Sequence, residues 1–430
     1  MGDIKNNIIY KIVIFFIFIF FFYGFFIQED AAGGGKNDFI FHIYNNILLF
    51  KNYNFLEIPW SSYDSSSLPL YYLITKYLIP TKNPYIFKLF TFFLSLGCVL
   101  IFYKILQKKY NELKDHNHIF LLISVIPLLS PYFRTSAFWG IEENITYFFF
   151  LITSFFFFKN IKKKLNLFFL IFFSCTTFYS RQNYAFLILI IFFFIFSFKD
   201  KFTIKNACVI TYFMTFLLPS LYFFYKWGGV INKVEINNSI TTRPLNFNLF
   251  NVPIILSIYF LYYIPLIIVN IKYYFNKFIS IPKLIFFIIS FLFFLQIFKQ
   301  NPEILFAQKL GNGLIYKLIF NYGFFSNYKY LALVFFLFIA FLGLVFSIFY
   351  CIKNSNFLIY FSTTLCIFSF IDIVFQEYFD PLIFFFFFIF GNFFKKTEIK
   401  KVGISYLIFY FLLIMSTLIH RNYILIHQFT

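Results

Sequence analysis

Residues 28–72 hold the first concentration of side chains that could do acid–base chemistry. The segment is acidic in a chain whose formal net charge is +19, and its titratable residues include Glu29, Asp30, Asp38, His42, Glu57 and Asp64. Asp38 and His42 are four residues apart, so a helix would place them on one face. A carboxylate in this position could take a proton from an attacking hydroxyl group. The alternative is a solvated loop aspartate without a chemical role.

Two further polar groups lie between apolar runs. Glu142 and Glu143 precede the run 144–158, where they could act on a substrate or simply stabilise the positive end of a helix dipole. Arg181 is one of only four arginines and is followed by Gln182. An arginine can contact a phosphate through two parallel hydrogen bonds, which a lysine cannot do. The alternative for Arg181 is a side chain that extends to the membrane interface.

These motifs resemble those of the GT-C superfamily, the polytopic glycosyltransferases that use a polyprenyl-phosphate sugar donor. The most similar family is that of the dolichyl-phosphate-glucose α-1,2-glucosyltransferases, which add the terminal glucose to the lipid-linked N-glycan precursor. In the first loop the matching residues are Asp38, His42, Trp60, Ser66, Ser67, Pro69 and Tyr72. Phe39 replaces a glutamate of that pattern, and Ser61-Ser62 replace an Asp-Pro pair.

The resemblance continues along the chain in the same order. Glu143 lies twelve residues after Pro131, and Arg181-Gln182-Asn183 resembles the family's Arg-Gln-Thr-Asn. Gly228-Gly229, after Lys226-Trp227, resembles a Gly-Gly motif at the end of a span. Glu377 matches a glutamate of the last motif, whereas Phe379 stands where the family has an arginine.

The resemblance implies a role for each matched side chain. Asp38 would be the catalytic base and Glu143 would support it, while Arg181 and Lys226 would bind the donor phosphate. The implied substrate-binding residues are His42, Trp60, Trp139, Gln182, Trp227, Gly228, Gly229 and Glu377. We expect Asp38, Glu143, Arg181 and Glu377 to line one cleft at the outer membrane surface.

The elements that must position these residues are membrane helices. The chain is 61% hydrophobic with a mean hydropathy of +0.79, which is well above a soluble domain. We expect an all-α, polytopic protein with one membrane domain, residues 1–430, and a first outer loop at 28–85 that forms interfacial helices. Thirteen apolar runs are candidate spans: 8–27, 86–107, 118–133, 144–158, 165–178, 183–198, 207–226, 249–271, 280–298, 331–351, 356–376, 381–394 and 404–421.

The lysine distribution predicts the topology. If residues 68–80 lie along the interface and the N-terminus is cytoplasmic, every strongly basic short loop falls on the cytoplasmic side, as the positive-inside rule requires. The basic charge therefore indicates membrane topology rather than nucleic-acid binding. The three tryptophans, Trp60, Trp139 and Trp227, then fall on the outer side. This side is the lumen of the endoplasmic reticulum or the bacterial periplasm, and the sequence leaves both open.

The predicted partners are a polyprenyl-phosphate sugar donor, a glycan or glycolipid acceptor and membrane lipid. The five cysteines lie in apolar runs without a zinc-like spacing, so no metal site is predicted, and dependence on a divalent metal stays open. Two other classes of protein remain possible. A lipid or glycolipid flippase would be expected to carry more charges inside its spans, and a membrane scaffold would need no catalytic carboxylate.

Overall fold

The computed structural model describes most of the chain in several segments. They are residues 2–65, 67–159, 163–196, 204–227, 229, 234–236, 239–241, 247–278, 281–300, 305, 311, 313–320, 325, 327–371, 374–391 and 398–428. The chain divides into two compact units. Unit 1 comprises Met1–Arg243 and Tyr410–Thr430, and unit 2 comprises Pro244–Phe409.

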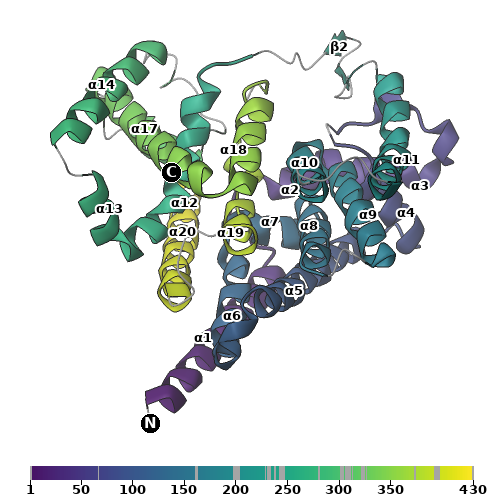
Figure 1. The fold of residues 1–430 in the computed structure, drawn as a ribbon. Helices are drawn as coiled ribbons and strands as arrows, with labels where there is room; N and C mark the ends of the chain where they lie inside the picture. Colours follow the sequence, from purple (N-terminus) through teal and green to yellow (C-terminus); the bar gives the residue numbers. More distant parts are fainter. Residues whose placement is uncertain are drawn as a thin grey trace. The chain divides into compact units, whose positions relative to one another are not determined.

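Unit 1 contains the N-terminal helices and the predicted outer loop. Its longer helices are α1 (Gly2–Phe26), α5 (Pro84–Lys109), α6 (Asn117–Val125), α7 (Pro131–Trp139), α8 (Glu143–Phe157), α9 (Lys164–Ser180), α10 (Ala185–Ile195) and α11 (Ile204–Trp227). Within the unit, α5 packs on α6, α7 and α8, while α9 packs on α8 and α11 (Figure 1). A short antiparallel hairpin, β1 (Val234–Ile236) and β2 (Ser239–Thr241), adds two strands that the sequence analysis did not predict.

Unit 2 is built around one helix pair, α12 (Asn251–Val269) and α17 (Lys329–Lys353). Its other helices are α13 (Ile271–Phe278), α14 (Ile281–Ile297), α16 (Gly313–Phe320), α18 (Ser355–Phe368) and α19 (Leu382–Ile389). The last helix, α20 (Ile399–Gln428), begins in unit 2, and its residues from Tyr410 onward group with unit 1. A Cβ atom at Gly343 would lie 2.1 Å from the Leu256 carbonyl oxygen, so this glycine lets α17 approach α12 closely.

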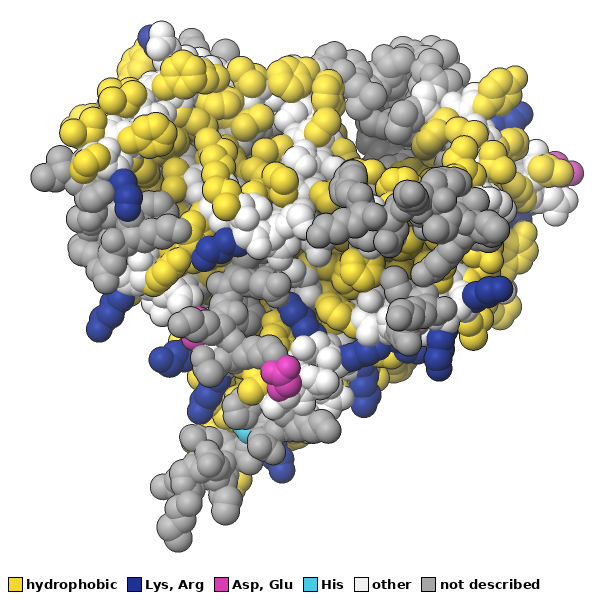
Figure 2. All heavy atoms as spheres, viewed as in Figure 1, with side chains coloured by type: hydrophobic (Ala, Val, Ile, Leu, Met, Phe, Trp, Pro, Cys, Tyr) yellow, Lys and Arg dark blue, Asp and Glu magenta, His cyan; other side chains and the backbone are white. Residues whose placement is uncertain are grey.

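Six helices are long and apolar enough to cross a membrane, and the bent pair described below would make a seventh. Among the described residues these are Ile8–Phe26, Pro84–Lys109, Val209–Trp227, Asn251–Val269, Lys329–Lys353 and Ile399–Ile419. Five shorter apolar helices accompany them: Glu143–Phe157, Lys164–Ser180, Gln182–Ile195, Pro282–Ile297 and Ser355–Phe368. Hydrophobic side chains also cover much of the visible surface (Figure 2). The fold is thus helical and has the lengths and composition of a multi-pass membrane protein.

The predicted span 118–133 is bent. Residues Asn117–Leu129 and Pro131–Trp139 form two helical pieces that meet at 70°. Pro131 cannot donate a backbone hydrogen bond, and Ser130 leaves the helical conformation, so its hydroxyl accepts a hydrogen bond from the Phe133 amide at 3.1 Å. A new helix, α7, therefore starts where the sequence analysis expected a span to end and a loop to begin.

The predicted first outer loop, residues 28–85, is largely helical, as expected from the sequence. It contains α2 (Gly35–Asn37), the π-helical turn η1 (Asp38–Ile43), α3 (Tyr44–Asn52), the short turns η2 (Phe55–Glu57) and η3 (Trp60–Ser62), and α4 (Leu70–Leu78). Helix α4 has nine residues. At 1.5 Å per residue it is about 14 Å long, which is too short to cross a hydrocarbon core of about 30 Å. This length agrees with an interfacial position for residues 68–80.

Candidate functional site

The predicted catalytic pair lies on a π-helical turn. Asp38 and His42 are both exposed members of η1, and the Tyr44 amide closes the turn by donating to the Phe39 carbonyl five residues earlier. Such wide turns occur mostly as single turns and are frequent at functional sites. The segment therefore presents a carboxylate and an imidazole from one short turn.

The three glycines before Asp38 set the start of this turn. Gly33 and Gly34 have φ angles of +78° and +90°, a region that favours glycine, and the Asp38 amide donates to the Gly34 carbonyl at 2.9 Å. Gly35 is buried, and a Cβ atom there would lie 2.4 Å from Cγ2 of Thr135 on α7. From its composition alone this glycine run favours a flexible hinge. The structure packs it against α7 and so fixes the entry to η1.

A buried ion pair anchors the beginning of the loop. Arg134 on α7 is fully buried and donates through Nε and Nη2 to the two carboxylate oxygens of Glu29, at 2.8 and 2.6 Å. Its Nη1 and Nη2 also donate to the carbonyls of Leu128 and Phe20, each at 3.1 Å. Every one of these contacts joins segments that are distant in sequence or separated by the bend. Together they hold the start of the loop to α1 and α7.

His42 is paired with Asp64 from the far end of the loop. The His42 Nδ1 atom lies 2.5 Å from an Asp64 carboxylate oxygen. Asn46, one turn beyond His42, is buried and forms two hydrogen bonds with the Asp64 backbone, at 2.9 and 3.0 Å. A carboxylate beside one ring nitrogen fixes the orientation of the imidazole and leaves the other nitrogen for a substrate.

Arg181 contacts both carboxylates of the predicted pair at the start of α8. Its Nη2 atom forms an ion pair with Glu143 Oε1 and lies 3.5 Å from Glu142 Oε1. Ser67 donates to Glu142 Oε1 at 2.8 Å and so adds the first loop to the cluster. All four side chains are buried or largely buried. Glu143 Oε2 is buried and has no hydrogen-bond partner among the described residues, so one carboxylate oxygen is left for another donor.

The charges of these groups act on Asp38. The surrounding protein partly desolvates the Asp38 carboxyl group, and this raises its pKa most, followed by the negative charge of Glu143. The charges of His42 and Arg181 lower it, but not enough to reverse the shift. Asp38, Glu143 and Arg181 come from three distant segments and are nevertheless within electrostatic range of one another. An exposed carboxylate with a raised pKa is a better proton acceptor than an ordinary aspartate.

Glu142 differs from Glu143 in its environment. Complete burial raises the pKa of Glu142 to about 6, and the positive charge of Arg181 only partly offsets this rise. The Tyr72 hydroxyl also lies close enough to favour the charged form. In the sequence, Glu142 was considered together with Glu143, but only Glu143 was assigned to the predicted site. Its position beside Glu143 was the available signal.

Two of the three tryptophans belong to one aromatic cluster. The Tyr63 ring stacks on Trp227 with centroids 6.0 Å apart and makes an edge contact with Trp60 at 5.9 Å. Phe223 contacts both tryptophans, at 5.4 and 5.9 Å. Tyr63 is within electrostatic range of Glu142, so the cluster adjoins the carboxylates. The Trp227 Nε1 group is buried and has no hydrogen-bond partner among the described residues.

Trp139 lies apart from this cluster, at the anchored start of the loop. Its Nε1 donates to the Glu29 carbonyl at 3.1 Å, and the Lys88 ammonium lies 3.8 Å from the centre of its ring. Trp139 is buried. These contacts show a side chain that holds the loop, which differs from the substrate contact that the sequence analysis predicted.

Of the remaining predicted residues, Lys226, Gln182, Gly229 and Glu377 lie within the described part of the chain. Lys226 is exposed, with its ammonium 5.8 Å from the centre of the Tyr222 ring, and Gln182 follows Arg181 at the start of a short turn. Gly229 is exposed, while Gly228 lies outside the described residues, as does Ser66 of the first-loop pattern. Glu377 belongs to unit 2, where its charge acts on Lys317.

Comparisons with known proteins give no match for this chain: no model of a known protein family, no characterised protein and no solved structure matches it. Within the described part of the chain, no group of three or more His, Cys, Asp or Glu side chains is arranged to hold a metal ion. The site combines the accessible Asp38 carboxylate, Arg181 and the partly exposed Trp60 ring, which together suit proton removal from a hydroxyl group beside an anionic, partly apolar substrate.

Proposed function

We propose that the chain is a membrane glycosyltransferase of the GT-C type, which transfers a hexose from a polyprenyl-phosphate donor to a hydroxyl group of a lipid-linked glycan. The resemblance of the motifs favours glucose as the sugar and dolichyl phosphate as the carrier. One observation carries the proposal. Asp38, exposed and with a raised pKa, lies within electrostatic range of Arg181 and Glu143, although the three residues come from distant segments.

The proposed reaction is a single displacement at the sugar's anomeric carbon. The acceptor oxygen attacks this carbon, the bond to the phosphate oxygen breaks with inversion, and Asp38 takes the acceptor proton. Arg181 stabilises the negative charge that remains on the polyprenyl phosphate, and Lys226 contributes a second positive charge. Glu143 orients Arg181 through their ion pair. The reaction as written needs no cofactor.

The aromatic cluster is the proposed sugar-binding surface. Trp60 is partly exposed and would contact the sugar, while the buried rings of Tyr63 and Trp227 pack around it and hold it in place. His42 and Gln182 would contact hydroxyl groups, and Gly228 and Gly229 would admit the substrate close to the backbone. Glu377 is assigned to acceptor binding on the resemblance alone.

The proposed topology has thirteen spans, with the N-terminus in the cytoplasm and the site on the luminal or periplasmic side. Each of the thirteen predicted runs contains a helix, but only six or seven of the described helices are long enough to cross a membrane, so the proposed count rests on the basic loops. The basic loops 159–164 and 395–401 would be cytoplasmic, while 28–67 and 227–248 would lie on the outer side. Single cysteines at positions 162 and 232 should be labelled from opposite sides of intact vesicles. Labelling of both from the same side would contradict this topology.

Two substitutions test the proposed roles with purified protein and a short-chain polyprenyl-phosphate glucose. Asp38→Asn keeps the shape of the side chain and should lower kcat by roughly 10²–10⁴-fold, the usual loss when a general base is removed. Arg181→Lys keeps the charge but loses paired contacts. It should weaken donor binding by about 1.5–3 kcal/mol, the range for a hydrogen bond to a charged group. The first variant should therefore change mainly kcat and the second mainly the donor KM.

A matched control is Glu57→Gln, which alters an exposed carboxylate of the same loop. Its kinetics should equal those of the wild type. Full activity in Asp38→Asn would remove the base assignment, and an unchanged donor KM in Arg181→Lys would remove the phosphate role. A flippase, the alternative function, would move the lipid-linked sugar across vesicles without forming a glycosylated product.

A further inference from the structure

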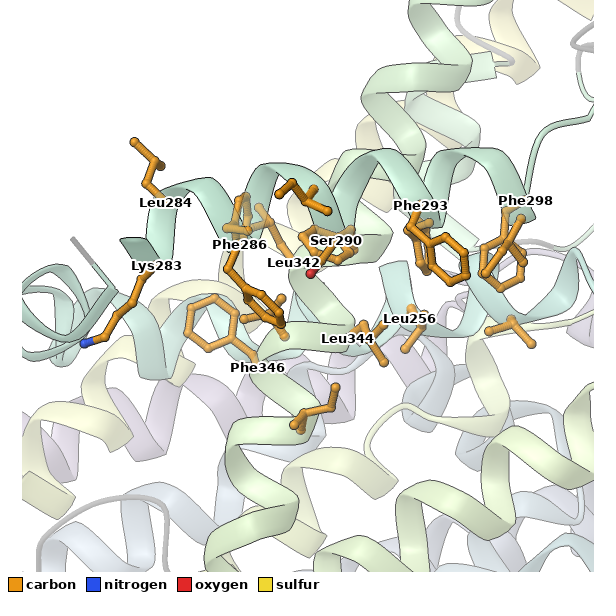
Figure 3. Close-up of a pocket in the computed structure, with 18 of the residues that line it drawn as sticks. Leu256, Lys283, Leu284, Phe286, Ser290, Phe293, Phe298, Leu342, Leu344 and Phe346 are labelled. Atoms are coloured by element: carbon orange, nitrogen blue, oxygen red, sulfur yellow. The ribbon is translucent and has the colours of Figure 1, made fainter. Parts of the chain in front are cut away.

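Unit 2 contains a large apolar cavity that lies outside the proposed active site. It has a volume of about 1070 Å³ and is lined by α12, α14, α17 and one residue of α18. Figure 3 shows side chains of α14 along one wall, from Lys283 and Leu284 at one end to Phe298 at the other. Leu256 of α12 and Phe346 of α17 lie on the opposite wall.

The cavity exists because α14 contacts α17 along only one stripe. On that stripe Phe287, Phe291 and Phe294 pack against the rings of Phe338 and Phe341, with centroids 5.0–6.4 Å apart. Helices α12 and α17 approach each other closely at Gly343, whereas α14 stands away from them. Bulky residues on the rest of α14, including Phe286 and Phe293, remain exposed.

The chemistry of the wall defines the class of ligand. Among the described lining residues only Lys283 and Ser290 have polar side chains, and all the others are apolar. A cavity of this kind stays free of water, because water needs several polar partners. Around helices in a bilayer, lipid is the abundant molecule, and its hydrocarbon chain can fill such a cavity. From Lys283 to Phe298 the helix is about 22 Å long, enough for one acyl chain.

The positive charge of Lys283, at one end of the cavity, favours a lipid with an anionic head group. Lys283 is exposed and carries the positive charge at the end of α14 that follows the basic segment 272–277. On the proposed topology this end faces the cytoplasm, where the membrane surface is rich in anionic lipids. Basic pockets between helices on that side bind lipid head groups through their phosphates.

We propose that the cavity binds one anionic membrane phospholipid, with its phosphate at Lys283 and an acyl chain along α14. The bound lipid fills the space between α14 and the α12–α17 pair. It therefore completes the packing of unit 2 rather than taking part in sugar transfer.

The test uses the full chain purified in a mild detergent and transferred to nanodiscs. One set contains phosphatidylcholine alone, and the other contains phosphatidylcholine with one part in five of phosphatidylglycerol. Lipids that remain bound after gentle detergent exchange are identified by native mass spectrometry, and thermal unfolding is recorded in both sets. The variants are Lys283→Ala, Lys283→Arg and the control Lys299→Ala, which removes an exposed lysine beyond the other end of α14.

The wild type should retain phosphatidylglycerol in preference to phosphatidylcholine and should unfold at a higher temperature when it is present. Lys283→Ala should bind the anionic lipid about fivefold more weakly, the change expected from one lysine near an anionic head group. Lys283→Arg and Lys299→Ala should behave as the wild type. Equal losses in Lys283→Ala and Lys299→Ala, retention of a polyprenyl lipid instead of a phospholipid, or no bound lipid would each overturn the proposal.

A second variant tests the cavity itself. Leu342→Trp places a large side chain in the cavity and should reduce the retention of phosphatidylglycerol and phosphatidylcholine alike, because it occupies the space of the acyl chain. The unfolding temperature in phosphatidylcholine alone shows whether this variant is folded. A folded Leu342→Trp protein that retains the wild-type amount of lipid would place the lipid elsewhere.

Discussion

Unit 1 and unit 2 differ in how their buried polar side chains are paired. In unit 1, Arg134 pairs with Glu29, and Arg181 pairs with Glu143, in each case within a buried or largely buried environment. Unit 2 also buries one carboxylate, Asp380, but the buried hydrogen bonds that join α12 to α17 and α18 are between neutral groups. Tyr259 and Tyr263 bond to the hydroxyls of Thr364 and Ser347, each at 2.8 Å.

This difference indicates where function is located. Removing two charges from water costs several kcal/mol per ion, and apolar residues of similar volume often stabilise a fold equally well. Buried charges within a membrane protein are therefore expected to serve a site or to fix its geometry. Neutral hydroxyl pairs carry no such cost and serve packing. Apart from Glu377, the described residues of the proposed active site lie in unit 1, and the proposed lipid cavity lies in unit 2.

The largest expected effect comes from breaking the Arg134–Glu29 pair. Arg134→Met leaves the Glu29 carboxylate buried without its partner, which should lower the free energy of unfolding by about 3–5 kcal/mol. Denaturation by SDS in mixed micelles measures this change. The double variant Glu29→Leu/Arg134→Met should recover most of the loss, because neither charge remains. A loss below about 1 kcal/mol in the single variant would contradict the buried-pair explanation.

A smaller loss in the free energy of unfolding is expected from Gly24→Ala on α1. A Cβ atom at Gly24 would lie 2.4 Å from Arg134 Nη2, 2.8 Å from the Phe138 ring and 2.9 Å from Glu29 Oε2. Overpacking of this kind should cost about 1–3 kcal/mol in the same measurement. The control is Gly97→Ala, whose nearest contact is the Phe148 ring at 3.1 Å. Equal losses in both variants would show that contact with the ion pair is not the cause.

Much of the fold of both units was predictable from hydrophobic runs, because a helix must cover the hydrocarbon core with about 20 apolar residues. The helical first loop and the short α4 were predicted correctly. The bend at Ser130 was not predicted, since the apolar run continues through it and only the cap and Pro131 reveal the break.

The site in unit 1 was predictable in part. Asp38, Glu143 and Arg181 were found from residue type and spacing, and the structure brings them within electrostatic range. The Arg134–Glu29 pair was missed, because no local pattern links residues 105 positions apart in sequence. The rarity of arginine in this chain was the one available signal. The cavity of unit 2 left no trace in the sequence, since a loosely packed apolar helix and a tightly packed one have the same composition.

The stability of the protein should depend on pH through the Glu142 carboxyl group. Because its pKa is raised to about 6 in the folded protein from an ordinary 4.5, the folded state binds the proton more tightly. Protonation of Glu142 therefore stabilises the folded state. This stabilisation is fully present below pH 4.5 and is lost as the pH rises through 6. Above that pH the charged form should cost about 2 kcal/mol, the equivalent of this shift. Glu142→Gln should therefore stabilise the protein by up to about 2 kcal/mol at pH 7.5 and have little effect at pH 4.5.

The control for this measurement is Glu57→Gln, an exposed carboxylate of the same unit. Its stability relative to the wild type should not change between pH 4.5 and 7.5. If Glu142→Gln destabilises the protein at pH 7.5, the attraction between charged Glu142 and Arg181 stabilises the fold by more than the burial of that charge destabilises it. Glu142 would then belong with Glu143 as a permanent partner of the arginine.

The smallest effect is expected in unit 2, from the Tyr263–Ser347 hydrogen bond. Tyr263→Phe removes the hydroxyl that bonds to Ser347 and keeps the ring that stacks on Phe387. Hydrogen bonds between membrane helices contribute about 0.6 kcal/mol on average. A double-mutant cycle with Ser347→Ala should therefore give a coupling of this size, against the 3–5 kcal/mol expected for the charged pair of unit 1. A coupling above about 2 kcal/mol would show that neutral hydrogen bonds and buried charges contribute on the same scale, and the distinction between the units would fail.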